Sequence, residues 1–433
     1  MAKEYKDLVV GLDIGTSKVM AVVAEVLPDG ELKIAGLGIA PGNGLKRGVV
    51  VNIDATVQSI QQALKEAELM ADCKITRVNC GITGSHIRGL NSSGMVAIKD
   101  KEVTPADVAR VMETARAINI STDQRLLLVA PQEFVIDGQD VKEPIGMSGM
   151  RLEAKVHIVT GAQSAAENII KCVRRCGLEV DQLLLNPQSS SLAVLTEDER
   201  ELGVACVDIG AGTTDVAIFA GGAIRHTAVI PIAGDLITSD IAMALRTPTK
   251  DAEDIKVESG YAKQMLADPE AQVEVPGLGD RGPRMLSKQA LAGVIEPRVE
   301  EIFSLVQQVV RESGYEEVLS SGIVLTGGGA LLGNLDYVLR HSTGLPVSIA
   351  DDPLRDLVRP QLLERAPELL ALVTSRHPEP ARALMAVRPV ADETHLLVRE
   401  GARDLEQPIR WGCVPNAPEA SAEVHAPTIS GVR

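Results

Sequence analysis

Residues 207–219, "VDIGAGTTDVAIF", decide the fold of this chain, because a polar turn separates two segments that read as buried strands. The turn holds glycines, hydroxyls and carboxylates in the order Asp-x-Gly-x-Gly-Thr-Thr-Asp. Residues 10–26, "VGLDIGTSKVMAVVAEV", have the same plan of strand, polar glycine turn and strand. A chain that repeats one unusual turn is predicted to have a duplicated fold, with one site between its two halves.

The composition disfavours one class of partner. The chain has 433 residues, enough for more than one hydrophobic core, and its 45% hydrophobic and 24% charged residues are ordinary for a globular protein. A net charge of −16 repels nucleic acid, and an aromatic content of 2% leaves little for base stacking. We therefore expect no nucleic-acid partner.

The N-terminus and the cysteines indicate an intracellular protein. "MAKEYKDLVV" has no apolar signal core, and no run of about 18 apolar residues occurs, so we expect a cytoplasmic chain without a spanning helix. Six cysteines in so long a chain do not form a disulfide framework. Cys172 and Cys176, four apart on a predicted helix, are expected to be buried free thiols.

Strands alternate with helices over most of the chain, which predicts an α/β fold. Residues 84–155 look like an insertion, and residues from about 235 to 320 look mostly helical. Of the 23 prolines, 10 lie beyond residue 352, a density that breaks helices and strands alike. The predicted division is a first half (1–83 and 156–200), an insertion (84–155), a second half (201–235 and 321–354), a helical block (236–320), a loosely structured segment (355–410) and a disordered tail (411–433).

The first glycine turn has the residues of an anion site. Glycine permits the positive φ of a tight turn and lets the backbone approach a ligand closely. Successive N–H groups then form a concave site, to which hydroxyls add donors. A carboxylate beside such a site makes sense if Mg²⁺ lies between it and a phosphate. The candidates are Asp13, Gly15, Thr16, Ser17 and Lys18. Taken alone, this turn is equally well a hairpin with polar tip residues.

Two further turns extend the pattern. The second turn adds a glycine and a second carboxylate, and two such hairpins would clamp a polyphosphate from opposite sides; its candidates are Asp208, Gly210, Gly212, Thr213 and Thr214. The third, at Gly327, Gly328 and Gly329, is predicted to join a strand to a helix N-terminus, where backbone donors and the helix dipole suit an anion or a nucleotide. No P-loop, H-E-x-x-H or nucleophile-elbow motif occurs.

Two phosphate hairpins and a late strand with three glycines resemble the superfamily of actin, heat-shock chaperones and sugar kinases. Within it, the chain is similar to the FtsA family of bacterial cell-division proteins, above all in "LAVLTEDERELGVACVDIGAGTTDVAIFAGGAIRHTAVIPIAGDLITSDIA" and "GIVLTGGGALL". The resemblance covers about residues 6–340. It implies an actin-like (ribonuclease H-like) duplicated fold around a nucleotide cleft, with subdomains 1A and 2A as the two halves, 2B as the helical block and 1C as the insertion.

The resemblance also implies a function. Its members bind ATP with Mg²⁺, self-associate into filaments, and link the tubulin-like FtsZ to the cytoplasmic membrane at the septum together with other division proteins. By motif, Asp13 and Asp208 become the catalytic and metal-holding residues of what is at most a weak ATPase. Glu253 and Lys256 match the helix that meets the ribose and base, and Arg298 matches the region that grips the FtsZ tail. Lys256 as a solvated helix residue and Arg298 as an exposed one are the alternatives.

The sequence leaves two alternative functions open and departs from the family pattern in two places. Asp13, Asp208 and Asp215 offer a carboxylate base, so a superfamily ATPase or small-molecule kinase is an alternative. "LRHSTGLPVSIADDPL" is similar to the cell-shape actin MreB, which makes an MreB-like filament protein another. The segment "LLLNPQ" suggests slow hydrolysis, because Asn186 precedes the proline where relatives often place Glu or Gln. The last 20 residues have no amphipathic stripe or basic face, so we expect no direct membrane binding by this chain.

Overall fold

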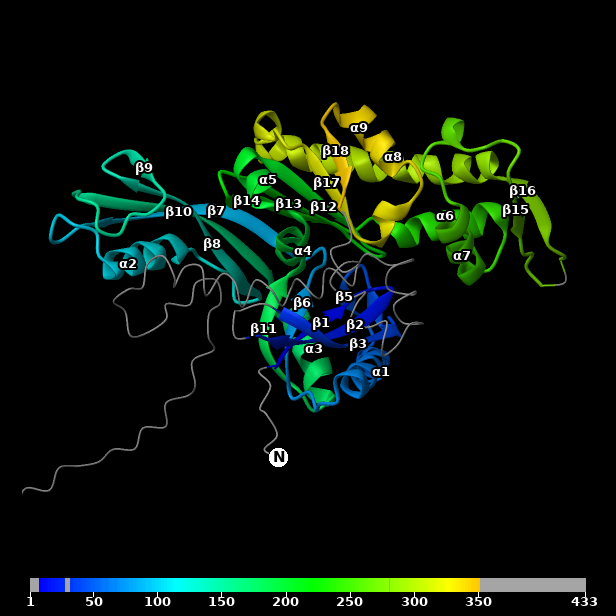
Figure 1. Cartoon of the computed structure of the whole chain (residues 1–433), viewed down its shortest axis with the longest axis horizontal. Helices are drawn as coiled ribbons and strands as arrows, with labels where there is room; N and C mark the ends of the chain where they lie inside the picture. The colour runs from blue at the N-terminus through cyan, green and yellow to red at the C-terminus, as the bar shows by residue number, and fades with distance from the viewer. Residues whose placement is uncertain (1–7, 28–31, 280, 351–433) are drawn as a thin grey trace, which may run out of the picture.

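The computed structural model describes residues 8–27, 32–279 and 281–350, and Figure 1 shows their arrangement. The expectations for 355–410 and 411–433 lie outside the described residues. Two five-stranded sheets form the centre of the molecule, with a four-stranded sheet extending to one side and a helical block to the other (Figure 1).

The first sheet has the order β11-β6-β1-β2-β3. Its first three strands in the chain form an antiparallel meander, and β6 and β11 then add in parallel beyond β1. The bounds are β1 Leu8–Ile14, β2 Lys18–Val26, β3 Leu32–Pro41, β6 Arg77–Ile82 and β11 Glu179–Leu185.

The second sheet repeats this topology in the order β14-β13-β12-β17-β18. Again three antiparallel strands are followed by two strands that add in parallel beyond the first one. The bounds are β12 Val204–Ile209, β13 Thr214–Ala220, β14 Ala223–Ile230, β17 Ile323–Thr326 and β18 Val347–Ile349. The matching orders and directions confirm the duplicated α/β fold that the repeated turn predicts.

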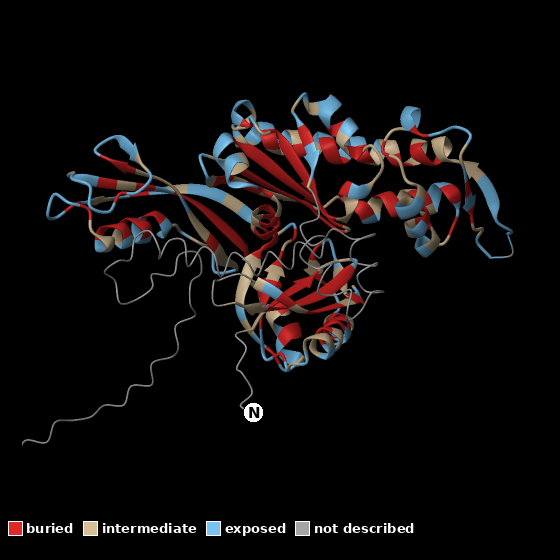
Figure 2. Cartoon of the chain, viewed as in Figure 1, coloured by how far each residue is buried: buried red, intermediate tan, exposed pale blue. Residues whose placement is uncertain are grey.

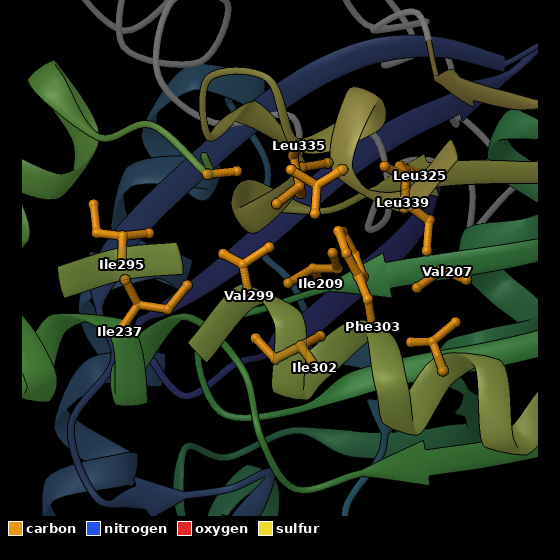
Figure 3. Close-up of a cluster of buried hydrophobic side chains, with 14 of the residues drawn as sticks. Val207, Ile209, Ile237, Ile295, Val299, Ile302, Phe303, Leu325, Leu335 and Leu339 are labelled. Atoms are coloured by element: carbon orange, nitrogen blue, oxygen red, sulfur yellow. The ribbon is translucent and has the colours of Figure 1, made fainter. Parts of the chain in front are cut away.

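Helices bury the faces of both sheets, and most strand residues are buried (Figure 2). In the first half α1 (Ile53–Ala71) and α3 (Gln163–Arg175) pack on each other and on the strands. In the second half α8 (Lys288–Ser313) and α9 (Leu335–Thr343) share one hydrophobic cluster with the sheet. Ile209, the last residue before the second glycine turn, lies in that cluster beside Val299 and Phe303 (Figure 3). Burying it anchors the turn to the core.

The inserted sheet has the order β7-β10-β8-β9 and carries α2 on one face. Its bounds are β7 Arg88–Ala97, α2 Pro105–Arg116, β8 Gln124–Ile136, β9 Gln139–Val141 and β10 Arg151–Ala162. Thr104 caps α2 through a capping box with Asp107, and Pro105 is the first residue of the helix. β10 pairs with β7 and β8 over its whole length. The boundary expected after residue 155 therefore falls inside a strand of the inserted sheet.

The remaining elements join these parts. The helical block contains α6 (Gly234–Leu245), α7 (Thr249–Ser259), η1 (Gln264–Leu266) and the hairpin of β15 (Gln272–Val275) and β16 (Arg284–Ser287), together with α8. The short hairpin of β4 (Leu45–Lys46) and β5 (Val49–Val50) precedes α1, and η2 (Glu316–Val318) follows α8. α4 (Asn186–Val194) and α5 (Glu197–Leu202) connect the two halves.

A buried histidine links the inserted sheet to the second half. The His157 ring is 1% exposed, with Nδ1 2.7 Å from Asn91 Oδ1 and Nε2 2.9 Å from Thr227 Oγ1 on β14. A neutral ring satisfies both contacts, donating to the amide oxygen and accepting from the hydroxyl. Burial, and to a smaller extent the charge of His226, lower the pKa of His157 to about 4.

Acid is expected to weaken this junction. In the folded protein the pKa of His157, about 4, lies below its ordinary value of 6.5. The contribution of the neutral ring to folding stability is therefore complete above pH 6.5 and is lost as the pH falls toward 4. The loss is on the order of 3 kcal/mol. His157→Gln does not titrate, so its deficit in thermal unfolding midpoint against wild type should narrow from pH 7.5 to pH 4.5. His341→Gln, at an exposed histidine, is the control. An equal deficit at both pH values contradicts the assignment.

Candidate functional site

The two glycine turns are hairpins with the same internal hydrogen bond. The N–H of Gly15 donates to the carbonyl of Lys18, and the N–H of Gly210 donates to the carbonyl of Thr213, both at 2.9 Å. A strand ends just before each turn, and each strand carries an aspartate as its second-last residue. The repeated sequence plan is thus a repeated backbone plan.

Close approach, and not a left-handed backbone, is what requires glycine in these hairpins. Gly15 and Gly212 have no φ in the left-handed region, so the expectation of a positive φ was wrong. A Cβ on Gly15 would lie 2.8 Å from the carbonyl oxygen of Lys18, and one on Gly212 would lie 2.4 Å from Thr16 Oγ1. Both distances are too short for any side chain.

The two hairpins meet each other across the halves. The Gly212 contact joins the second hairpin to Thr16 of the first. Thr83, just after β6, donates its hydroxyl to both carboxylate oxygens of Asp215 on β13, at 3.0 and 2.8 Å. Residues from both halves therefore form one cluster.

The two candidate metal ligands are buried and lie beside α4. Asp13 is 7% exposed and Asp208 is 1% exposed. Ser190 on α4 donates to Asp208 Oδ2 at 2.5 Å. Asn186, one turn earlier, faces Gly81 together with Asp13, since a Cβ on Gly81 would lie 2.4 Å from Asn186 Oδ1 and 3.4 Å from Asp13 Oδ1.

This donor set fits Mg²⁺ bound together with a nucleotide. Mg²⁺ in proteins is commonly held by one or two carboxylates, with phosphate oxygens and waters completing the octahedron. Among the described residues no three of His, Cys, Asp and Glu gather as a metal cluster. Asp13 and Asp208 would hold the ion only with the help of phosphates lying on the hairpins.

The third glycine turn packs on the second hairpin. Gly327 has a φ of +84°, and a Cβ there would lie 2.4 Å from Asp208 Oδ1. A Cβ on Gly329 would lie 2.4 Å from Ile209 Cγ2. The turn continues as η3 (Gly328–Leu331), a 3-10 segment, and α9 begins only at Leu335. A four-residue 3-10 helix therefore takes the place where the sequence predicts the N-terminus of a longer helix, and the turn lies against Asp208 and Ile209.

Lys256 is part of the cluster and is no solvated helix residue. Its side chain on α7 is 13% exposed, and Nζ donates to Glu253 Oε2 at 2.6 Å, to Thr238 Oγ1 at 2.9 Å and to the carbonyl of Gly234 at 3.2 Å. The N–H of Gly234 in turn donates to the carbonyl of Gly210 at 3.1 Å. A chain of hydrogen bonds thus ties Lys256 and Glu253 to the second hairpin.

The other candidates differ in how far solvent or a ligand reaches them. Ser17 is exposed at the tip of the first hairpin, whereas Lys18 is 6% exposed at the start of β2. Thr213 is buried at 7% exposure. Thr214 is fully buried, and its hydroxyl donates to the carbonyl of Ile232 at 2.8 Å. That hydroxyl secures the hairpin.

Arg298 lies on α8 and is half-buried. Its guanidinium binds Asp240 of α6 through Nε, at 2.7 Å, and through Nη2, at 3.2 Å, and it also binds Glu301. The hydrogen bond to Asp240 raises the pKa of Arg298. Arg298 is therefore not the freely exposed helix residue of the alternative reading, and its contacts go to the α6–α8 pair and not to the hairpins.

Thr83 and Ser190 were missed as members of the cluster. Thr83 opens a Thr-Gly pair directly after a strand, and Ser190 belongs to the "QSSS" run in α4. Both signals occur often in loops and helix starts, so only the tertiary contacts single them out.

The expected free thiols are present: Cys172 is buried and Cys176 is partly exposed. In the described part of the chain, no helix has the length and apolarity needed to cross a membrane.

The duplicated sheets and the hairpin cluster between them define an actin-like protein. The family model "Cell division protein FtsA" matches residues 205–366, and "SHS2 domain inserted in FTSA" matches residues 84–160. The chain therefore belongs to the FtsA family of cell-division proteins.

Relatives named "Cell division protein FtsA" cover most of the chain. That of Pseudomonas aeruginosa is 57% identical over 359 residues, which are 81% of this chain and 86% of the relative. That of Escherichia coli K12 is 49% identical over 338 residues, 76% of this chain and 80% of the relative. The solved structure of the "PilM-PilN type IV pilus biogenesis complex" matches with a TM-score of 0.61 at 20% identity, over 88% of this chain and 98% of that one. This last likeness shows the fold alone.

Proposed function

We propose that this FtsA-family protein binds Mg·ATP where the two hairpins meet, assembles into filaments at the septum, and links FtsZ polymers to the cytoplasmic membrane. The carrying observation is the contact of both hairpins, Thr16 with Gly212, beside two buried carboxylates. Two anion-binding turns from opposite halves fit a polyphosphate better than any single-phosphate ligand.

Each part of the cluster has a role in this proposal. The backbone N–H groups of the hairpins hold the phosphates, and Asp13 and Asp208 hold Mg²⁺ through water. Gly327, Gly328 and Gly329 would pack on the adenosine, and the turn itself is supported from behind by Ile209. Lys256 and Glu253 approach the ribose and base from α7. The ion, when bound, neutralises phosphate charge.

The same geometry supports ATP hydrolysis that is slow at most. Asn186 faces Gly81 beside Asp13, where it can orient a water but cannot accept its proton as a carboxylate does. A kinase would instead use a carboxylate as a base toward a substrate hydroxyl. Steady-state ATP turnover with and without candidate acceptors distinguishes a kinase from a filament-forming linker protein. Turnover that depends on an acceptor contradicts the proposed linker function.

A nucleotide bound between the two halves would change the contacts that join them. Thr83 with Asp215 and Thr16 with Gly212 are contacts between halves, so a ligand bound between them changes what each half touches.

Reversing the charge at Arg298 is expected to weaken binding of an FtsZ C-terminal peptide by about 1–2 kcal/mol, a factor of about 5–30. The reason is the loss of a cation that attracts an acidic peptide. Arg298→Glu also breaks the ion pair with Asp240 and places a new carboxylate beside those of Asp240 and Glu301. The substitution therefore disturbs the α6–α8 packing as well. Peptide affinity is measured by fluorescence anisotropy.

The charge swap Arg298→Asp with Asp240→Arg separates the two effects. The swap keeps an ion pair between α6 and α8 and moves the cation to the neighbouring helix. If Arg298 contacts the peptide itself, the swapped protein binds as poorly as Arg298→Glu while its thermal midpoint recovers. Recovery of both affinity and midpoint would show that Arg298 serves only the helix pair.

A further inference from the structure

The β4–β5 hairpin has an unusual turn. Its two central residues, Arg47 and Gly48, have φ of +50° and +76°. Positive φ at both positions is the pattern of a type I′ turn, for which Asn-Gly and Asp-Gly are the preferred pairs. Arginine is an uncommon choice at the first position, because its Cβ disfavours the left-handed region. Such residues cluster at ligand-binding sites.

The turn is packed into the hairpin cluster. The N–H of Gly48 donates to Thr16 Oγ1 of the first hairpin at 3.2 Å. A Cβ on Gly212 of the second hairpin would lie 3.0 Å from the Cα of Arg47. A Cβ on Gly48 would lie 3.1 Å from Thr83 Cγ2. The backbone of Arg47 therefore lies against the second hairpin, although it belongs to the first half.

The side chain of Arg47 is a cation without a partner inside the described ranges. It is exposed, and no carboxylate or carbonyl of residues 8–27, 32–279 and 281–350 binds its guanidinium. The buried carboxylates nearby are engaged elsewhere: Asp215 accepts from Thr83, and Asp208 accepts from Ser190. An unpaired cation at the edge of the proposed polyphosphate site is expected to bind a phosphate group.

We propose that Arg47 binds the terminal phosphate of the nucleoside triphosphate and so makes the site distinguish tri- from diphosphate. The guanidinium is always charged, and its planar fork matches two phosphate oxygens. Because the turn touches both hairpins, holding the terminal phosphate also fastens the β4–β5 turn against the second half. The inference rests on the nucleotide site proposed above and extends it to a residue outside the glycine turns.

Arg47→Asn is the decisive variant. Asn-Gly is a favoured type I′ pair, so this change removes the guanidinium while keeping the turn. Binding of ATP and of ADP, each with Mg²⁺, is measured by isothermal titration calorimetry. The expected result is a loss of about tenfold in ATP affinity, with ADP affinity changed by less than about twofold. Lys46→Asn removes the same charge from the adjacent exposed position and should change neither affinity.

Each alternative outcome contradicts a specific part of the proposal. Unchanged ATP affinity in Arg47→Asn, with wild type binding ATP, overturns the role of Arg47 and leaves the nucleotide site standing. An equal loss for ATP and ADP places the guanidinium away from the terminal phosphate, and an equal loss in Lys46→Asn reduces the effect to general charge. Failure of wild type itself to bind either nucleotide overturns the proposed nucleotide site.

Discussion

Replacing Gly212 by valine is expected to reduce the affinity for Mg·ATP by at least about a hundredfold, close to 3 kcal/mol. The Cβ alone would lie 2.4 Å from Thr16 Oγ1 and 3.0 Å from the Cα of Arg47, and the two valine methyl groups add to this overlap. The hairpins must then separate, which spoils the clamp on the phosphates. Calorimetric titration of the folded variant with ATP and Mg²⁺ measures the effect.

Gly282→Val is the matched control. A Cβ on Gly282 meets nothing within 4 Å, and the residue is exposed next to β16, so the same substitution costs nothing at the site. Circular dichroism establishes that both variants are folded. A folded Gly212→Val protein with wild-type ATP affinity would falsify the placement of the phosphates between the hairpins.

Asp208→Asn is expected to change ATP affinity in opposite directions with and without Mg²⁺. In EDTA, removing a buried negative charge beside the phosphates should raise the affinity about tenfold. With Mg²⁺, the loss of the carboxylate that holds the ion through water should lower the affinity about a hundredfold. The amide keeps the shape of the side chain and still accepts the hydrogen bond from Ser190, so the fold is preserved.

Asp140→Asn, at an exposed aspartate on β9, controls for the change in net charge. It should leave both affinities at the wild-type value. A parallel fall of the Asp208→Asn affinity in Mg²⁺ and in EDTA would mean that Asp208 shapes the hairpin without holding the ion.

Expectations that follow from local sequence were met most fully. The repeated turn predicts a duplicated fold, and the two sheets have the same strand order and directions. In the structure, the start of α2 is set by its Thr-Pro pair, and the end of α8 by Gly314, which caps it. These features depend on a few adjacent residues, which is why a single sequence suffices. The roles of the site residues and the residue limits of the domains stay predictions.

The errors have a common physical cause. A positive φ at Gly15 and Gly212 and an exposed position for Lys256, the latter only as an alternative, were inferred from neighbours in the chain. In the structure these positions are determined by other segments: Thr16 excludes a side chain at Gly212, and Thr238 together with the carbonyl of Gly234 accepts from Lys256. The sequence shows that a position is special but not which distant segment makes it so.

The sequence by itself determined that this chain has two similar halves, each with a glycine hairpin after a buried strand, because strand periodicity and turn chemistry are local properties. Only the tertiary structure decided which side chains meet. Thr83 reaches Asp215 across 132 residues, and Arg298 reaches Asp240 across 58. Such pairs depend on how the sheets and helices pack, and packing is a property of the whole chain, not of any segment.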